Sequence, residues 1–131
     1  MGLVLLDTDV SSFFIKKSSY AEPYLPLIQK QEVAVSFMTE AELYQWAYVR
    51  NWGKSRIKEL TDYLDGLTII YADQPMCCHW AKIRTEQRAR GMVISPQDAW
   101  VAATALRYDL PLITNNIKDF QHIPCLNLLR A

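Results

Sequence analysis

The sequence is poor in residues that many binding sites need, and each shortage excludes something. It has three cysteines, Cys77, Cys78 and Cys125, and no C-x-x-C pair. Adjacent cysteines cannot close a useful disulfide loop. Consecutive helical residues point about 100° apart, so Cys77, Cys78 and His79 cannot converge on one metal ion. We therefore expect buried or neutral thiols in a reducing compartment.

Histidine, long apolar runs and net charge are scarce as well. The two histidines, His79 and His122, have no Ser or Cys partner in an evident context, so the chain offers no candidate for covalent catalysis. No apolar run approaches the roughly 20 residues that span a bilayer, and no basic segment precedes an apolar one at the start. We expect a cytoplasmic protein without a membrane partner. The 14 Lys and Arg balance the 14 Asp and Glu, a sum that could conceal a local basic patch.

What the chain does have is short apolar runs separated by helical segments. Half of its 131 residues are hydrophobic, which is typical of one globular domain over residues 1–131. Strands are predicted at Leu3–Leu6 and at residues 32–37, 67–71, 110–114 and 126–129. Helices are predicted at residues 8–31 with interruptions near Pro23 and Pro26, and at residues 39–50, 54–65, 75–90 and 96–108. This alternation predicts an α/β fold with a mostly parallel sheet of four to five strands between two helical layers.

An acid follows directly on the first predicted strand. Leu3–Leu6 is an uninterrupted apolar run, typical of a strand buried on both faces, and Asp7 ends it. A buried carboxylate is costly unless something pairs with it. In open parallel sheets, ligands bind beyond the carboxyl ends of the strands. Asp7 therefore either caps the next helix or binds something positive.

Two further acids lie where helices are predicted to begin. Thr39 and Glu42 have the spacing of a capping box, and Ser95 is the expected N-cap of the helix that carries Asp98. A carboxylate in the first turn of a helix is favoured by roughly 0.3–1 kcal/mol through the helix dipole. Capping therefore explains each of these two acids when it is considered alone.

The acids as a set are harder to explain by capping. Asp7, Glu42, Asp98 and Asp119 all fall at strand ends or helix starts near one edge of the predicted sheet. Mutual repulsion opposes such a gathering unless a cation lies between the carboxylates. Oxygen ligands select a hard ion, so the four acids predict a site for Mg²⁺ or Mn²⁺.

Four segments resemble the motifs of PIN domains, and specifically those of VapC toxins from prokaryotic toxin–antitoxin pairs. They are LLDTDVSSFF, VSFMTEAELYQWA, ISPQDAWVAATAL and LITNNIKDFQHIP, in matching order and spacing over residues 5–124. The resemblance implies a PIN-like fold. It also implies a metal-dependent endoribonuclease that cuts single-stranded RNA by two-metal-type hydrolysis. As partners it implies a cognate antitoxin and a second copy of the chain.

The resemblance further implies roles for individual residues. The four acids match the catalytic, metal-binding positions of the family. Thr114 matches a hydroxyl residue that supports them, and Asn116 lies where some relatives carry an acid. Asp9 stands where Asn is common and is expected to support the site without binding the ion. Trp46 replaces the usual Gly, a departure that bears on local packing and choice of partner.

Two surfaces are candidates for binding. Lys82, Arg84 and Arg88 crowd one helix and would contact the RNA backbone, or would simply form a solvated helix face. A second stripe, Tyr44, Tyr48 and Trp52, repeats at i, i+4 and i+8. Such a stripe belongs either to the core or to a groove for the antitoxin or for the dimer partner.

Two other functions remain open from the sequence. The segment LLDTDV has the strand-then-D-x-D form of haloacid-dehalogenase-like phosphatases, but those need a late acidic pair where LITNN offers amides. The chain could also be a catalytically silent PIN-like module that binds RNA or protein. Loss of one of the four acids would be its sign, and none is missing.

Overall fold

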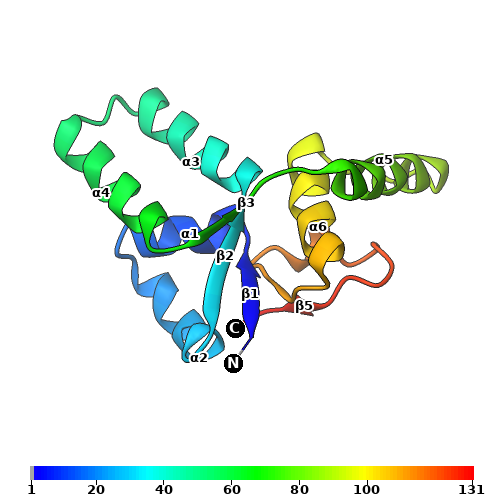
Figure 1. The fold of residues 1–131 in the computed structure, drawn as a ribbon, viewed down its shortest axis with the longest axis horizontal. Helices are drawn as coiled ribbons and strands as arrows, with labels where there is room; N and C mark the ends of the chain where they lie inside the picture. The colour runs from blue at the N-terminus through cyan, green and yellow to red at the C-terminus, as the bar shows by residue number, and fades with distance from the viewer. Residues whose placement is uncertain (1) are drawn as a thin grey trace.

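The computed structural model describes residues 2–131 and is built around a five-stranded parallel sheet (Figure 1). The strands, in the spatial order β3-β2-β1-β4-β5, are β1 (Leu3–Leu6), β2 (Glu32–Ser36), β3 (Thr68–Ile70), β4 (Leu112–Ile113) and β5 (Leu128–Leu129). The α-helices are α1 (Thr8–Ile15), α2 (Leu25–Ile28), α3 (Phe37–Val49), α4 (Lys54–Asp65), α5 (Gln74–Ala89) and α6 (Pro96–Tyr108). Two 3-10 turns, η1 (Ser19–Tyr24) and η2 (Ile117–Asp119), complete the chain. The predicted α/β class and parallel sheet are confirmed.

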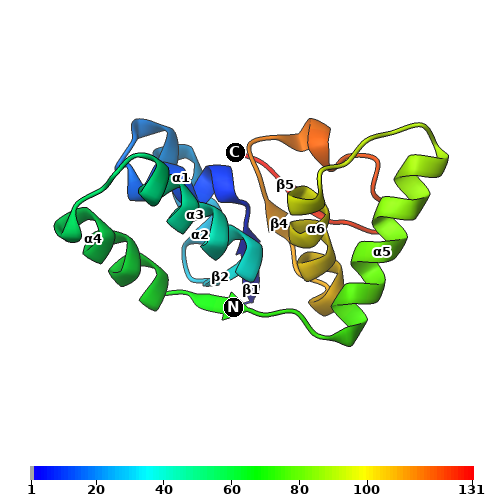
Figure 2. The same cartoon turned by 90° about the horizontal axis from the view of Figure 1, so that it is seen from above.

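The central strand β1 is apolar throughout because both of its faces are covered. Leu5 is fully buried in one core with Ala34 and Leu112, its partners in the neighbouring strands. Val4 and Leu6 point the other way, into a second core. Helices α5 and α6 cover the first face, and α1, α3 and α4 cover the second (Figure 2). The three predicted layers are therefore present, with one core on each side of the sheet.

The start of α3 differs from the prediction. Strand β2 ends at Ser36, whose hydroxyl accepts the N–H of Met38 at 3.1 Å and caps the helix. Thr39 therefore lies inside the first turn, fully buried, and the predicted Thr39–Glu42 capping box is wrong. Ser36 takes the cap because it is the first hydroxyl residue after the apolar run, with the extended backbone that an N-cap needs. The predicted cap of α6 is confirmed, since the Ser95 hydroxyl accepts the N–H of Asp98 at 3.0 Å.

Other predicted features are shorter or more exposed than expected. The helical stretch at residues 8–31 is divided after Ile15, where Lys17 adopts a positive φ of 54°. All three cysteines are exposed, not buried. In the described part of the chain, no helix has both the length and the apolarity to cross a bilayer.

Candidate active site

Asp7 lies at the carboxyl edge of the sheet, where β1 ends and α1 begins. Its side chain is buried, with 7% of the residue exposed. One carboxylate oxygen accepts the N–H of Thr8 at 2.8 Å and so caps α1. The other accepts the hydroxyl of Thr114 at 2.9 Å, which the parallel pairing of β1 with β4 brings alongside. The sequence left open whether Asp7 caps a helix or binds a cation, and the cap is present.

The helix cap does not offset the free-energy cost of burying the charged Asp7 carboxylate. Burial, followed by the charges of Asp9 and Asp98, raises the pKa of Asp7 to about 7, although the bonds from Thr114 and Thr8 oppose the shift. Two hydrogen bonds are thus insufficient to stabilise the charge of Asp7 at this position. A bound cation would provide the stabilisation of the Asp7 charge that the two hydrogen bonds do not provide.

Glu42 lies on α3 and is connected to the same edge of the sheet by hydrogen bonds that involve two threonines. The Thr8 hydroxyl donates to a carboxylate oxygen of Glu42 at 2.8 Å. Because that hydroxyl has only one proton, its 2.9 Å contact with Thr39 is a bond donated by Thr39. Burial raises the pKa of Glu42, against the lowering effect of the Thr8 bond. Sequence reasoning missed Thr8 and Thr39 as part of the site, because their only signal is a position beside a strand end and a helix start.

Asp98 and Asp119 approach from the other side of the sheet edge. Asp98 lies in the first turn of α6, where burial, followed by the charges of Asp119, Glu42 and Asp9, raises its pKa to about 6. Asp119 ends the η2 turn and is exposed, and the side-chain amide of Asn116 donates a hydrogen bond to it. The backbone N–H of Asn116 donates to the Thr114 hydroxyl at 3.0 Å, so one loop connects Asp119 to Asp7.

Asp9 joins α1 to the loop that follows β4. One of its carboxylate oxygens accepts the N–H of Asn115 at 3.1 Å, and the other accepts the N–H of Val10. Burial raises the pKa of Asp9, and the charge of Asp119 adds to that effect. Asp9 therefore contributes both an anchor for the loop and a further negative charge.

The acids influence one another electrostatically without forming a closed cage. Asp98 raises the pKa of Asp7, and Asp119 raises that of both Asp98 and Asp9. Even so, among residues 2–131 no three acidic, histidine or cysteine side chains converge tightly enough to enclose an ion. This arrangement still fits Mg²⁺, which keeps several waters and takes only one or two carboxylates together with substrate phosphates. The donors are all oxygens, as a hard ion requires.

Asp98 and Asp119 also line a hollow of about 450 Å³ at the surface. Lys118 and His122 lie in the same lining, and Gln87, only 4% exposed, donates its amide to the carbonyl of His122 at 3.1 Å. The sequence did not single out Lys118. Its position next to Asp119 in the segment after β4 is the only signal that could have indicated it.

Of the three basic residues predicted to contact the RNA backbone, two lie at a hollow of the surface and one does not. Arg84 and Arg88 line a second hollow beside the first, whereas Lys82 lines neither. Lys82 and Arg84 are two positions apart on α5, so they point to opposite sides of the helix.

The aromatic stripe is shorter than predicted. Tyr44 and Tyr48 stack with ring centroids 6.5 Å apart, and Tyr48 is 68% exposed. Trp52 does not continue the stripe, because α3 ends at Val49 and the chain turns. Trp52 packs instead against Trp46 with centroids 5.1 Å apart, so the Trp that replaces the usual Gly serves the junction between α3 and α4.

Comparison with known proteins decides the family. A model of the PIN domain matches residues 4–124. The chain belongs to the PIN-domain family. This PIN domain is 30% identical over 129 residues to ribonuclease VapC2 of Rickettsia felis, covering 96% of each chain. It is 28% identical over 123 residues to ribonuclease VapC1 of Haemophilus influenzae, covering 92% of each.

A solved structure supports the same assignment. This PIN domain superimposes on a chain in the structure of VapBC2 from Rickettsia felis bound to a promoter DNA fragment, with a TM-score of 0.87 and 27% identity. The match covers 100% of this PIN domain and 99% of that chain. The sequence resemblance to VapC-type PIN domains is confirmed.

Proposed function

We propose that this PIN domain is a VapC-type endoribonuclease toxin that hydrolyses single-stranded RNA with the help of Mg²⁺ or Mn²⁺. The ribonuclease assignment follows from the family and from the named VapC relatives. The observation that carries the metal requirement is Asp7. It is buried and doubly hydrogen-bonded, and its pKa is still raised to about 7 by burial and by neighbouring carboxylates.

The four acids would hold the ion, and the residues around them would orient the acids. When bound, the ion supplies the positive charge that polarises the phosphodiester and activates water. Thr114 and the N–H of Thr8 fix both oxygens of Asp7, and the Thr8 hydroxyl fixes Glu42. Asn116 holds Asp119, and Asp9 holds the loop that carries both. We assign these supporting roles to Asp9, Thr114 and Asn116.

The partner of the toxin is a cognate antitoxin, in keeping with the VapBC complex that it resembles. We also propose a homodimer. The support is the exposed apolar surface at the end of α3, where Tyr48 and Val49 are 68% and 71% exposed. Side chains of this size are typical of interfaces when they lie side by side on the surface.

The test is cleavage of total cellular RNA by the purified protein, with sequencing of the new 5′ ends. Mg²⁺ or Mn²⁺ should support cleavage that leaves 5′-phosphate and 3′-hydroxyl ends, and EDTA should stop it. Asp7→Asn should lower the rate by orders of magnitude while its circular dichroism spectrum stays that of the parent. If Asp7→Asn cleaves as fast as the parent, the activity is a contaminant. A silent binding module would bind RNA and cut none.

A further inference from the structure

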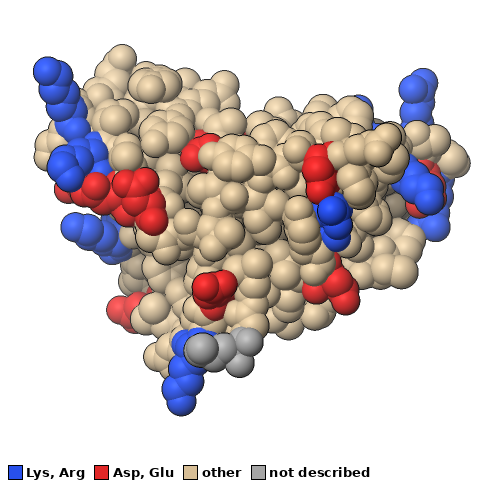
Figure 3. All heavy atoms as spheres, in the orientation of Figure 1, with Lys and Arg blue, Asp and Glu red and all other residues tan. Residues whose placement is uncertain are grey.

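The hollow that contains Asp98 and Asp119 continues into a second one. The second hollow, of about 380 Å³, is lined by Arg84, Thr85 and Arg88 and shares Met92, Val93 and Ile94 with the first. No acid lies in the lining of the second hollow. Lys and Arg side chains are prominent at the outer end of α5 in Figure 3. A chain that is neutral overall thus places basic groups directly beyond its acids.

The arginines of this hollow are free to bind an anion. Within residues 2–131 the ion pairs join Lys58 to Asp62 and Arg107 to Asp73, and neither Arg84 nor Arg88 takes part in one. A guanidinium group that lines a hollow without a carboxylate partner is suited to bidentate binding of a phosphate.

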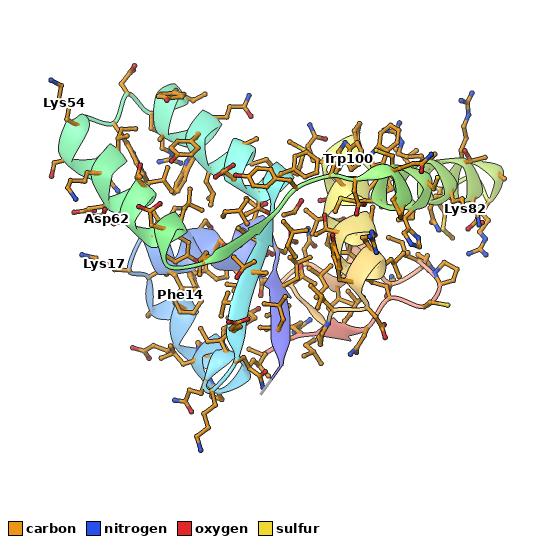
Figure 4. The ribbon with its side chains drawn as sticks, viewed as in Figure 1. Phe14, Lys17, Lys54, Asp62, Lys82 and Trp100 are labelled. Atoms are coloured by element: carbon orange, nitrogen blue, oxygen red, sulfur yellow. The ribbon has the colours of Figure 1, made fainter. Side chains whose placement is uncertain are left out.

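Arg84 is also held in place relative to the acids. Its guanidinium lies over the ring of Trp80, 5.4 Å from the centroid. The indole of Trp80 stacks on Trp100 at 4.9 Å and donates its N–H to the carbonyl of Pro96 at 3.1 Å. Trp100 lies where α5 and α6 meet (Figure 4). Because Pro96 begins the helix that carries Asp98, Trp80 fixes Arg84 with respect to the candidate active site.

The loop between the two hollows is anchored to the end of α5 by a backbone hydrogen bond and carries an apolar side chain at its tip. Gly91, at a φ of 72°, follows the C-terminal cap of α5, and the N–H of Met92 donates to the carbonyl of Gln87 at 2.8 Å. Val93 follows and is 99% exposed. Val93 is thus an exposed apolar side chain shared by the two hollows, and it can contact a base or a ribose while the backbone of a strand passes on either side.

We propose that the two hollows form one track for single-stranded RNA, running from the acids across Val93 to Arg84 and Arg88. Lys118 contacts the backbone nearest the acids, and the two arginines bind phosphates farther along the same strand. Trp80 is a positioning residue for Arg84. The proposal rests on the proposed ribonuclease function and extends it to one side of the cleaved bond. The acids repel RNA, so cations beyond them are needed to hold the strand.

The test compares two double variants that remove the same charge. Arg84→Gln/Arg88→Gln empties the second hollow of cations. Lys54→Gln/Lys82→Gln is the control, since Lys54 begins α4, away from α5 (Figure 4), and Lys82 lines neither hollow. Binding is followed by fluorescence anisotropy in an Asp7→Asn background, so that a single-stranded RNA of about 20 nucleotides, long enough to fill both hollows, stays intact.

We expect the arginine variant to bind RNA at least roughly tenfold more weakly at low salt than the control. The slope of log affinity against log salt should fall by about 0.7 for each phosphate that the protein no longer neutralises, and the control should keep the parent slope. With Asp7 restored, KM for RNA should rise and kcat should change little. Trp80→Phe should give a smaller change in the same direction, because it removes the bond to Pro96.

Other results overturn the proposal. If both double variants share the parent slope and KM, the track is wrong, while cleavage that depends on Asp7 still supports the nuclease. If the arginine variant binds RNA normally but separates from its co-expressed antitoxin, the hollow serves the antitoxin. If the parent cuts no RNA, the proposed function fails first. The anisotropy slopes then still show whether the hollow binds RNA.

Discussion

At the scale of single residues, the hydroxyl of Thr114 opposes the rise in the pKa of Asp7 that burial and the charge of Asp9 cause. It is fully buried and donates to the one carboxylate oxygen that the helix cap does not use. The bond lowers the pKa of Asp7, against burial and the charge of Asp9, which raise it to about 7. Because the proposed cation would bind the ionised form of Asp7, this bond would increase the fraction of molecules that can bind it at neutral pH.

Removing that hydroxyl should therefore shift the pH dependence of cleavage. In Thr114→Val the pKa of Asp7 rises further, so the acid limb of the profile of kcat/KM against pH moves to higher pH. At pH 7 the rate should fall roughly tenfold, because a hydrogen bond to a charged group is removed. At high pH the two profiles should approach each other. Thr114→Ser keeps the hydroxyl and should keep the profile of the parent; an identical profile for Thr114→Val would remove this role.

The acids should also make the metal-free protein less stable at higher pH. Burial and neighbouring charges raise the pKa of Asp7 to about 7 and of Asp98 to about 6. The folded state then binds more protons than the unfolded state, so stability falls as pH rises from about 4 to about 7 and stays low above it. In EDTA at pH 8, Asp98→Asn should melt at the same temperature as the parent or higher.

Metal ions should reverse that destabilisation. A divalent ion at about 100 times its Kd stabilises the folded state by about 2.7 kcal/mol, and Asp98→Asn should shrink the response. Mn²⁺ should exceed Mg²⁺ in this effect. Asp65→Asn, which changes an exposed acid at the end of α4, serves as the control in thermal melts. A melt indifferent to millimolar Mn²⁺, with a destabilised Asp98→Asn, would mean that the acid acts only as a helix cap.

At the scale of elements, Ser36 joins three of them. It ends β2, caps α3 through the N–H of Met38 and accepts the hydroxyl of Thr104 from α6 at 3.1 Å. Ser36→Ala removes the cap and leaves a buried hydroxyl with one fewer partner. We expect a decrease of roughly 1–2 kcal/mol in the free energy of unfolding, measured in urea. Ser55→Ala, on the exposed face of α4, should cost almost nothing. Equal effects would show that Ser36 caps no helix in solution.

The elements also show how far the sequence could be read. Apolar runs predicted every strand. The reason is clearest for β1, which is buried on both faces and needs an unbroken run, whereas the edge strands β3 and β5 are only partly buried. The Ser95 cap was predictable from a local pattern. The Ser36 cap was not, because Thr39 offered an equally good local pattern and only burial excludes it. Trp52 was placed on a continuous stripe by its i, i+4, i+8 spacing alone, although the helix was predicted to end at residue 50 and in the structure ends at Val49.

The candidate site, too, was predictable from the sequence only in part. The resemblance indicated the acids by position in the chain. The bonds of the Thr8 hydroxyl with Glu42 and with Thr39 were not predictable, because they join residues more than 30 positions apart and depend on how α1 packs on α3. The second hollow, lined by Arg84 and Arg88, was predicted only in part. Helix spacing grouped Arg84 with Arg88, but only the tertiary structure brings the loop at Val93 and Lys118 beside the same hollows.

At the scale of the whole molecule, we expect two copies to associate. Tyr48 and Val49 expose large apolar surfaces at the end of α3. Light scattering on the purified chain should give twice its 15.1 kDa mass. Tyr48→Glu/Val49→Glu should shift the mass toward a single chain, because two carboxylates would be buried without partners. A single-chain mass for the parent at all accessible concentrations would contradict the dimer.

The two cores on opposite faces of the sheet have a genetic consequence. Asp7 and Glu42 are positioned by β1 and α3, whereas Asp98 depends on how closely α6 approaches the sheet. That approach is set by alanines that are almost completely buried, Ala99, Ala102, Ala103 and Ala105. Larger side chains there force backbone shifts at a cost of roughly 1–3 kcal/mol, which a folded domain can survive. Bacteria selected to outgrow the toxin should therefore carry substitutions at these alanines as well as at the acids. Those survivors should still contain a folded, antitoxin-binding protein.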